Sequence, residues 1–112
     1  MCTKSQLEAI EEEMVNYYRS VYGDSIDTII LYGSYARGDY SDDSDIDITA
    51  IVRGNRVELQ KKLKKMWDFF FFFGLAYDVI VSPTVIPYDE FEQYKEKLPY
   101  YRNIVKEGRK IG

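Results

Sequence analysis

Apolar positions recur along the chain with two periodicities, and each periodicity predicts a different kind of secondary structure. Over residues 5 to 22 they recur every three or four positions, with glutamates on the other side, which predicts an amphipathic helix ending at Gly23. Residues 26 to 32, IDTIILY, are rich in β-branched side chains and predict a buried strand. Residues 45 to 52, DIDITAIV, begin with alternating polar and apolar side chains and predict a second strand.

Short connections and one long helix are expected around these strands. A helical turn over residues 34 to 37 is expected to follow the first strand and to stop at Gly38. Residues 55 to 73 carry a stripe of apolar side chains at helical spacing, which predicts a long helix with Gly74 as its stop.

The last third of the chain predicts one more strand and two short helices. Residues 75 to 81, LAYDVIV, indicate the third strand. Pro83 and Pro87 are expected to break the chain, and helices are expected over residues 88 to 97 and 99 to 107. This order predicts a single α/β (α+β) domain over residues 1–112, with a small sheet and helices packed on it.

Composition narrows the function classes. The net charge of −4 argues against direct nucleic-acid binding, which needs a basic face, although a metal ion would let an acidic protein bind a triphosphate. The sole cysteine, Cys2, can form no internal disulfide, and the polar start shows no secretory leader. No apolar run approaches the ~20 residues of a membrane span. We therefore expect a cytoplasmic protein whose chemistry, without histidine, runs on carboxylates, hydroxyls and cations.

Asp45 and Asp47 form the first candidate site. Residues two apart on a strand point to the same side, so these carboxylates stand together while Ile46 and Ile48 face the core. Carboxylates this close repel each other unless a cation lies between them, and hard oxygen ligands favour Mg²⁺ or Mn²⁺. The alternative, without a functional role, is a surface strand with two solvated aspartates.

Gly33 and Ser34 form the second candidate site. They follow a buried strand and open a helical turn, where backbone amides suit a phosphate group and glycine permits close approach. Ten residues separate Ser34 from Asp45, enough to bring the chain back beside the turn. A plain strand-to-helix turn is the alternative.

These two sites and their spacing resemble the signature of the DNA polymerase beta-like nucleotidyltransferase superfamily, in which G-S is followed after ten residues by D-x-D. The stretch GSYARGDYSDDSDIDI over residues 33 to 48 carries the match, and the chain looks most like the minimal antitoxin-type MNT members. One departure is Tyr35, where many of those members have arginine, which would cost a phosphate contact. The resemblance implies a nucleotidyltransferase fold.

The resemblance also implies a third carboxylate, and Asp78 inside the predicted third strand is the candidate. Asp27 is a weaker rival because it lies at the start of its strand. In the implied reaction a hydroxyl attacks the α-phosphorus of ATP. Asp45, Asp47 and Asp78 would then be the catalytic and metal-binding residues for two Mg²⁺ ions, with Mn²⁺ as an alternative. Arg37 either contacts phosphate or braces the acidic loop.

Size and resemblance together indicate a protein acceptor. The chain is too short for an acceptor-binding domain, and the resemblance implies a HEPN-domain toxin as partner, which would receive AMP on a tyrosine. The alternatives are a binding module that neutralises its partner by occlusion, and a catalytic subunit that modifies a small molecule with a helical partner.

Five consecutive phenylalanines, residues 69 to 73, offer a surface for a homo- or hetero-oligomer. Phe70 and Phe73 continue the core stripe of the long helix, whereas Phe72 falls on the opposite face. The alternative is that the two terminal helices cover this patch. Lys61, Lys62, Lys64 and Lys65 are expected on a solvated face of the same helix.

Overall fold

Strands and helices alternate along most of the described chain. The computed structural model describes residues 3–41 and 43–112, so Cys2 and Asp42 lie outside the described residues. The elements are α1 (Lys4–Tyr22), β1 (Ile26–Tyr32), α2 (Ser34–Arg37), β2 (Ile46–Val52), α3 (Arg56–Ala76), β3 (Val81–Pro87), α4 (Tyr88–Tyr94), α5 (Pro99–Glu107) and β4 (Arg109–Lys110). None of the helices in this described part combines the length and apolarity needed to cross a bilayer.

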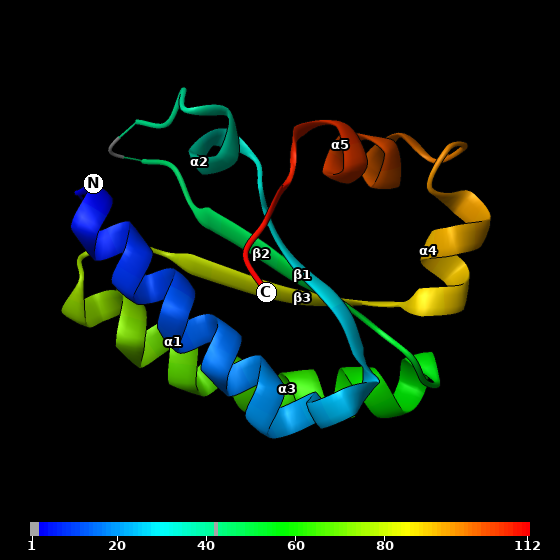
Figure 1. Ribbon diagram of the computed structural model, residues 1–112. Helices are drawn as coiled ribbons and strands as arrows, with labels where there is room; N and C mark the ends of the chain where they lie inside the picture. The colour runs from blue at the N-terminus through cyan, green and yellow to red at the C-terminus, as the bar shows by residue number, and fades with distance from the viewer. Residues whose placement is uncertain (1–2, 42) are drawn as a thin grey trace.

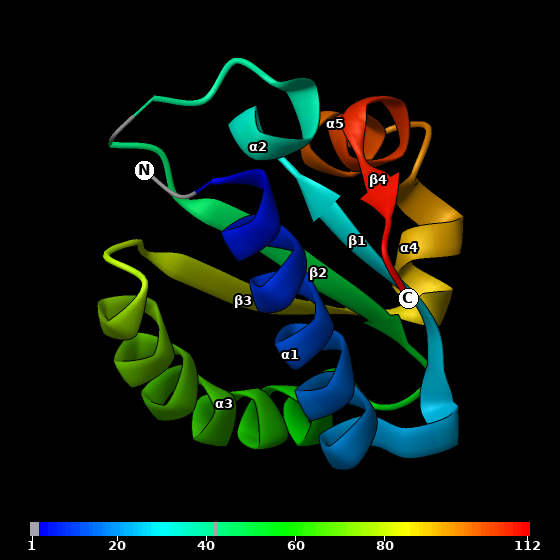
Figure 2. The ribbon, with the colours of Figure 1, turned by 60° about the vertical axis from the view of Figure 1, so that its left-hand side comes forward.

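The strands form one mixed sheet in the order β3-β2-β1-β4 (Figures 1 and 2). β1 runs antiparallel to β2 and to β4, and β2 runs parallel to β3. The register places Tyr32 of β1 opposite Asp47 of β2, and Ser82 of β3 beside Asp47 on the other side. Asp47 therefore lies inside the sheet with a neighbouring strand on each side.

The two faces of the sheet carry separate apolar clusters. α1 and α3 cover one face, whereas α4 and α5 pack on the other (Figures 1 and 2). Side chains along β2 alternate between the two clusters. Ile46 and Ile48 are buried in the cluster with α1 and α3, and Ile51 is buried in the cluster with α4 and α5. The small mixed sheet with packed helices is the architecture predicted from the sequence.

Polar side chains cap the starts of the two long helices, α1 and α3. Thr3 caps α1 in a capping box with Gln6, and Asn55 caps α3 by accepting hydrogen bonds from the amides of Val57 and Glu58. Both caps satisfy amides that the first helical turn cannot pair internally. The starts of the two long helices therefore follow from local sequence.

The predicted strand over residues 75 to 81 is wrong. α3 continues through Gly74 to Ala76, a turn follows, and β3 begins only at Val81. Gly74 does not stop the helix but lets the next turn fold back against it, because a Cβ there would lie 2.4 Å from the carbonyl oxygen of Val79. Gly74 is therefore required by close packing against the following turn, and it does not end the helix.

Of the two prolines expected to break the chain, Pro83 lies inside β3, whereas Pro87 is the last residue of that strand and directly precedes α4. Pro83 and Pro87 are tolerated because β3 is an edge strand, which needs ladder hydrogen bonds on one side only. At the other edge of the sheet, Arg109 and Lys110 form β4 directly after α5. That strand is too short to leave a pattern in the sequence.

Candidate functional site

Asp45 and Asp47 lie together at the start of β2. Asp47 is the second residue of the strand and Asp45 directly precedes it, and both are half-buried. Ile46 and Ile48 are fully buried on the opposite face, as the alternation predicts. Asp47 is therefore on the face of the sheet that carries α4 and α5, and Asp45 directly precedes the strand.

Gly33 brings its turn directly against Asp47. A Cβ on Gly33 would lie 2.6 Å from Oδ2 of Asp47, closer than real Cβ atoms come to a neighbour. Its backbone has φ 76 and ψ −157, a conformation open essentially to glycine alone. Gly33 is the N-cap of α2, so Ser34 is the first residue of that helix and does not cap it. The expected juxtaposition of the Gly-Ser turn and the acidic pair is present.

Electrostatics at this point favour a cation. Burial raises the pKa of the Asp47 carboxyl, the charge of Asp45 raises it further, and the guanidinium of Arg37 lowers it. Asp45 and Arg37 therefore act on Asp47 in opposite directions. A divalent cation between the two carboxylates would relieve both the desolvation and the repulsion.

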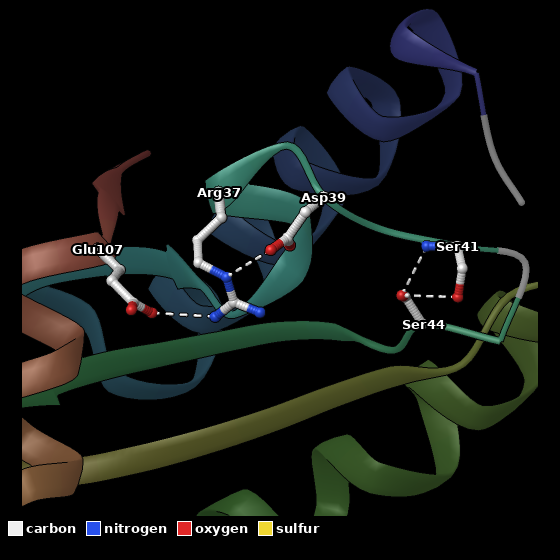
Figure 3. A network of polar contacts seen from close by, with 5 residues as sticks. All are labelled: Arg37, Asp39, Ser41, Ser44 and Glu107. Atoms are coloured by element: carbon white, nitrogen blue, oxygen red, sulfur yellow. Dashed lines mark hydrogen bonds and ion pairs between the residues drawn. The ribbon is translucent and has the colours of Figure 1, made fainter.

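Arg37 braces the loop and also reaches α5. Its Nε donates a hydrogen bond to Oδ2 of Asp39 at 3.1 Å, and its Nη1 donates one to Oε2 of Glu107 at 3.0 Å (Figure 3). In the same loop the amide of Ser41 donates to Oγ of Ser44 at 2.8 Å (Figure 3). Of the two roles weighed for Arg37, the structure contains the bracing one.

Asp78 is not where the sequence places it. It lies in the exposed turn after α3, with φ 55, rather than inside a strand, and the residue level with Asp47 on β3 is Ser82. The described residues contain no group of three His, Cys, Asp or Glu side chains placed to hold a metal ion. In the described residues Asp78 therefore does not form one group with Asp45 and Asp47, because α3 extends to Ala76 and the next strand begins only at Val81.

Asp78 still borders the site. A hollow of about 280 Å³ lies between the start of β2 and the turn after α3, and both Asp45 and Asp78 line it. Asp27, the weaker rival, is exposed and pairs with Arg53 at 3.2 Å. It lies at the start of β1, whereas the Gly-Ser turn follows the end of that strand. Asp27 therefore takes no part in the site.

Two uncharged polar side chains near Asp47, those of Tyr32 and Thr49, belong to no sequence motif and were not predicted. Burial raises the pKa of the Tyr32 hydroxyl, and the neighbouring Tyr100 and the charge of Asp47 raise it further. Thr49, two residues after Asp47, is fully buried, and its hydroxyl has no hydrogen-bond partner among the described residues. Period-two alternation along both strands is the one signal that could have found them.

Tyr35, the departure from the arginine of similar proteins, has a packing role. It is buried, and its ring stacks on Tyr40 with centroids 4.3 Å apart and 7° between the planes. Tyr35 thus ties α2 to the acidic loop.

The phenylalanine run of α3 divides as its helical spacing predicts. Phe70 is fully buried and Phe73 is half-buried, whereas Phe71 and Phe72 are 64% and 69% exposed. The alternative that the terminal helices cover this patch is wrong, because α4 and α5 lie on the other face of the sheet (Figure 2). The four lysines of α3 are exposed, as expected.

An apolar hollow joins the exposed patch to the acidic site. Trp67, Phe71 and Leu75, four residues apart along α3, line a hollow of about 150 Å³ together with Ile80. Leu75 and Ile80 also line the hollow that contains Asp45 and Asp78. An apolar surface therefore runs from α3 to the edge of the candidate site.

Comparison with known proteins identifies a family over nearly the whole chain. Residues 8–111 match the family model described as Nucleotidyltransferase domain. Two proteins of Methanocaldococcus jannaschii, each named “Putative protein adenylyltransferase”, are 35% and 33% identical to this chain. The first alignment covers 88% of this chain and 90% of the relative, and the second covers 70% and 80%.

Solved structures with the same fold include toxin–antitoxin complexes. A chain of a toxin–antitoxin crystallised with AMP-PNP has a TM-score of 0.57 at 18% identity, covering 91% of this chain and 72% of its own length. A chain from a complex of tri-AMPylated Shewanella oneidensis HEPN toxin with MNT antitoxin has a TM-score of 0.51 at 17% identity, covering 96% and 71%. At these identities the similarity establishes a shared fold.

Proposed function

The chain belongs to the nucleotidyltransferase domain family, and we propose that it transfers the AMP of ATP to a hydroxyl group of a partner protein. The observation that carries this proposal is the close approach of the Gly33 backbone to the carboxylate of Asp47, which leaves no room for a side chain at Gly33, with Asp45 alongside. The relatives named for protein adenylyl transfer support the choice of AMP and of a protein acceptor. The partner we propose is a HEPN-domain toxin, as in the structural neighbour, which would make this protein its antitoxin.

Asp45 and Asp47 are the residues we assign to Mg²⁺. Two neighbouring half-buried carboxylates, of which Asp47 has a raised pKa, form a donor set of the kind that hard divalent cations prefer. When bound, Mg²⁺ supplies charge neutralisation for a triphosphate and its leaving pyrophosphate. Asp78, in the turn after α3, lines the same hollow as Asp45.

The turn at Gly33 is assigned to the phosphate tail of ATP. Gly33 has no side chain to obstruct a ligand, and Ser34 opens α2 with a hydroxyl next to the backbone amides. Arg37 places a positive charge near Asp47, and two carboxylates hold its guanidinium in place. In this assignment the protein acts mainly by fixing the positions of ATP and of the attacking hydroxyl.

The apolar surface on α3 is the part of the molecule that we assign to the partner. It exposes Trp67, Phe71 and Phe72, and it continues to the rim of the acidic hollow through Leu75. Large exposed apolar patches are typical of protein interfaces. A partner seated there would bring an acceptor hydroxyl close to Asp45.

One observation favours a second function, neutralisation of the partner by occlusion without chemistry. Asp78 does not join Asp45 and Asp47 in a three-acid cluster. A protein with an incomplete metal site could still bind ATP and a partner. The two functions differ in whether a covalent bond forms.

The deciding experiment combines purified protein, Mg²⁺, ATP and a HEPN-domain toxin as the proposed partner, and follows that partner by intact-mass spectrometry. Addition of AMP supports transfer. A tight complex without added mass supports occlusion. Asp47→Asn should abolish the addition, whereas Asp27→Asn, at the other end of the sheet, should leave it unchanged.

A further inference from the structure

A pair of tyrosine hydroxyl groups lies beside the candidate site. Tyr32, the last residue of β1, is directly opposite Asp47, and directly opposite residues of an antiparallel pair share one face of the sheet. The Tyr32 hydroxyl is 2.7 Å from that of Tyr100 in the first turn of α5. The rings meet edge to face with centroids 5.9 Å apart. α5 thus brings the hydroxyl of Tyr100 within hydrogen-bond distance of the residue directly opposite Asp47.

Tyr100 is accessible, whereas the adjacent tyrosine is not. Tyr100 is 48% exposed. Tyr101 is 8% exposed, and its hydroxyl donates a hydrogen bond to Glu90. A bound nucleotide could therefore meet the hydroxyl of Tyr100 without disturbing the apolar cluster that contains Tyr101.

Both ends of α5 are tied to the region around Gly33. Tyr100 near the start of α5 contacts Tyr32, which directly precedes Gly33, and Glu107 at its end holds Arg37 of α2 at 3.0 Å (Figure 3). Two such contacts fix the helix relative to the turn. A hydroxyl held in place beside a reacting group attacks far more readily than one that must be ordered first.

We propose that the enzyme adenylylates itself on Tyr100, an inference that rests on the proposed function. Oη of Tyr100 attacks the α-phosphorus of ATP, a bond forms between that oxygen and phosphorus, and the bond from the α-phosphorus to the bridging oxygen of the β-phosphate breaks. Pyrophosphate leaves, and the phenolic proton passes to solvent. The product carries AMP in a phosphodiester linkage to Tyr100, whose Oη can then no longer donate a hydrogen bond to Tyr32.

The test uses the full chain alone with Mg²⁺ and ATP, followed by intact-mass and tandem mass spectrometry. We expect one AMP per chain, located on Tyr100, at a rate independent of protein concentration. Tyr100→Phe should abolish the addition with an unchanged melting temperature, since it removes one exposed hydrogen bond. Tyr101→Phe, the matched control, should keep the addition.

Each of the following results would overturn adenylylation of Tyr100 within one chain. AMP on another residue would exclude Tyr100 as the site, and a rate that rises with protein concentration would exclude the intramolecular geometry. An unmodified chain in a sample whose partner protein does become adenylylated would refute the inference while leaving the proposed function intact. If neither protein gains AMP although ATP binds, the proposed function fails as well.

Discussion

Gly33→Ala is the substitution that most selectively tests whether the close approach of Gly33 to Asp47 is needed for transfer. The backbone at Gly33 has φ 76 and ψ −157, and holding a residue with a side chain there costs about 1–3 kcal/mol. The added Cβ would also lie 2.6 Å from Oδ2 of Asp47, so the carboxylate must move. We expect a variant that folds with lower stability and has lost the position of its central acid.

The effect on transfer should exceed the effect on stability. A displacement of a reacting group by ~1 Å can cost about 100-fold in rate. Adenylyl transfer by Gly33→Ala should therefore fall by about that factor per folded molecule, with the folded fraction measured by circular dichroism at the assay temperature.

Gly38→Ala provides the matched control. Gly38 also has a positive φ of 86, but a Cβ there would meet nothing within 4 Å. This control should lose about 1–2 kcal/mol of stability from the left-handed backbone alone and keep its transfer rate. If Gly33→Ala transferred AMP as fast as Gly38→Ala, the contact between Gly33 and Asp47 would have no part in catalysis.

Three further predictions concern stability, pH and the partner surface. Asp47→Asn should stabilise the fold without ligand, because burial and Asp45 raise the pKa of Asp47 in the folded state and so make its ionised form costly. The gain should be full above the folded pKa and vanish below the unfolded one, and urea unfolding at several pH values would show a flat difference if the prediction is wrong. Tyr18→Phe should lower the free energy of unfolding by about 1–3 kcal/mol, since the buried Tyr18 hydroxyl donates to the carbonyl of Thr84 at 2.7 Å and accepts from its amide at 3.1 Å. Thermal melts would measure this, and a loss no larger than that of Tyr17→Phe would contradict it. Phe72→Asp should weaken partner binding with no loss of stability, because Phe72 is exposed, whereas Gln60→Asp, elsewhere on the same helix, should not; equal affinities by calorimetry would remove α3 from the interface.

The parts of the fold that follow from local sequence are those around the Gly-Ser turn. The β-branched run before Gly33 predicts β1 over its full length, and the alternation after Ser44 predicts the placement of Asp45 and Asp47. Gly38 ends α2 in a left-handed conformation, as expected of glycine after a short helix. These features depend on neighbouring residues alone.

The predictions from the sequence are wrong where tertiary packing overrides the local conformational preference of a residue. Gly74 has the local character of a helix stop, but it lies inside α3 because the turn at Val79 packs against it. That difference moves Asp78 from a strand into a turn. The ion pair between Arg37 and Glu107 joins residues 70 apart, and no local pattern could reveal it.

Binding of Mn²⁺ in the presence of AMP-PNP, followed by electron paramagnetic resonance, would test the central assignment most directly. Wild-type protein and Asp27→Asn should bind Mn²⁺ with the same affinity, whereas Asp45→Asn and Asp47→Asn should each bind it much more weakly. Equal binding by all four proteins would show that the carboxylates beside Gly33 do not hold the ion, and the assignment of this site to nucleotidyl transfer would fail.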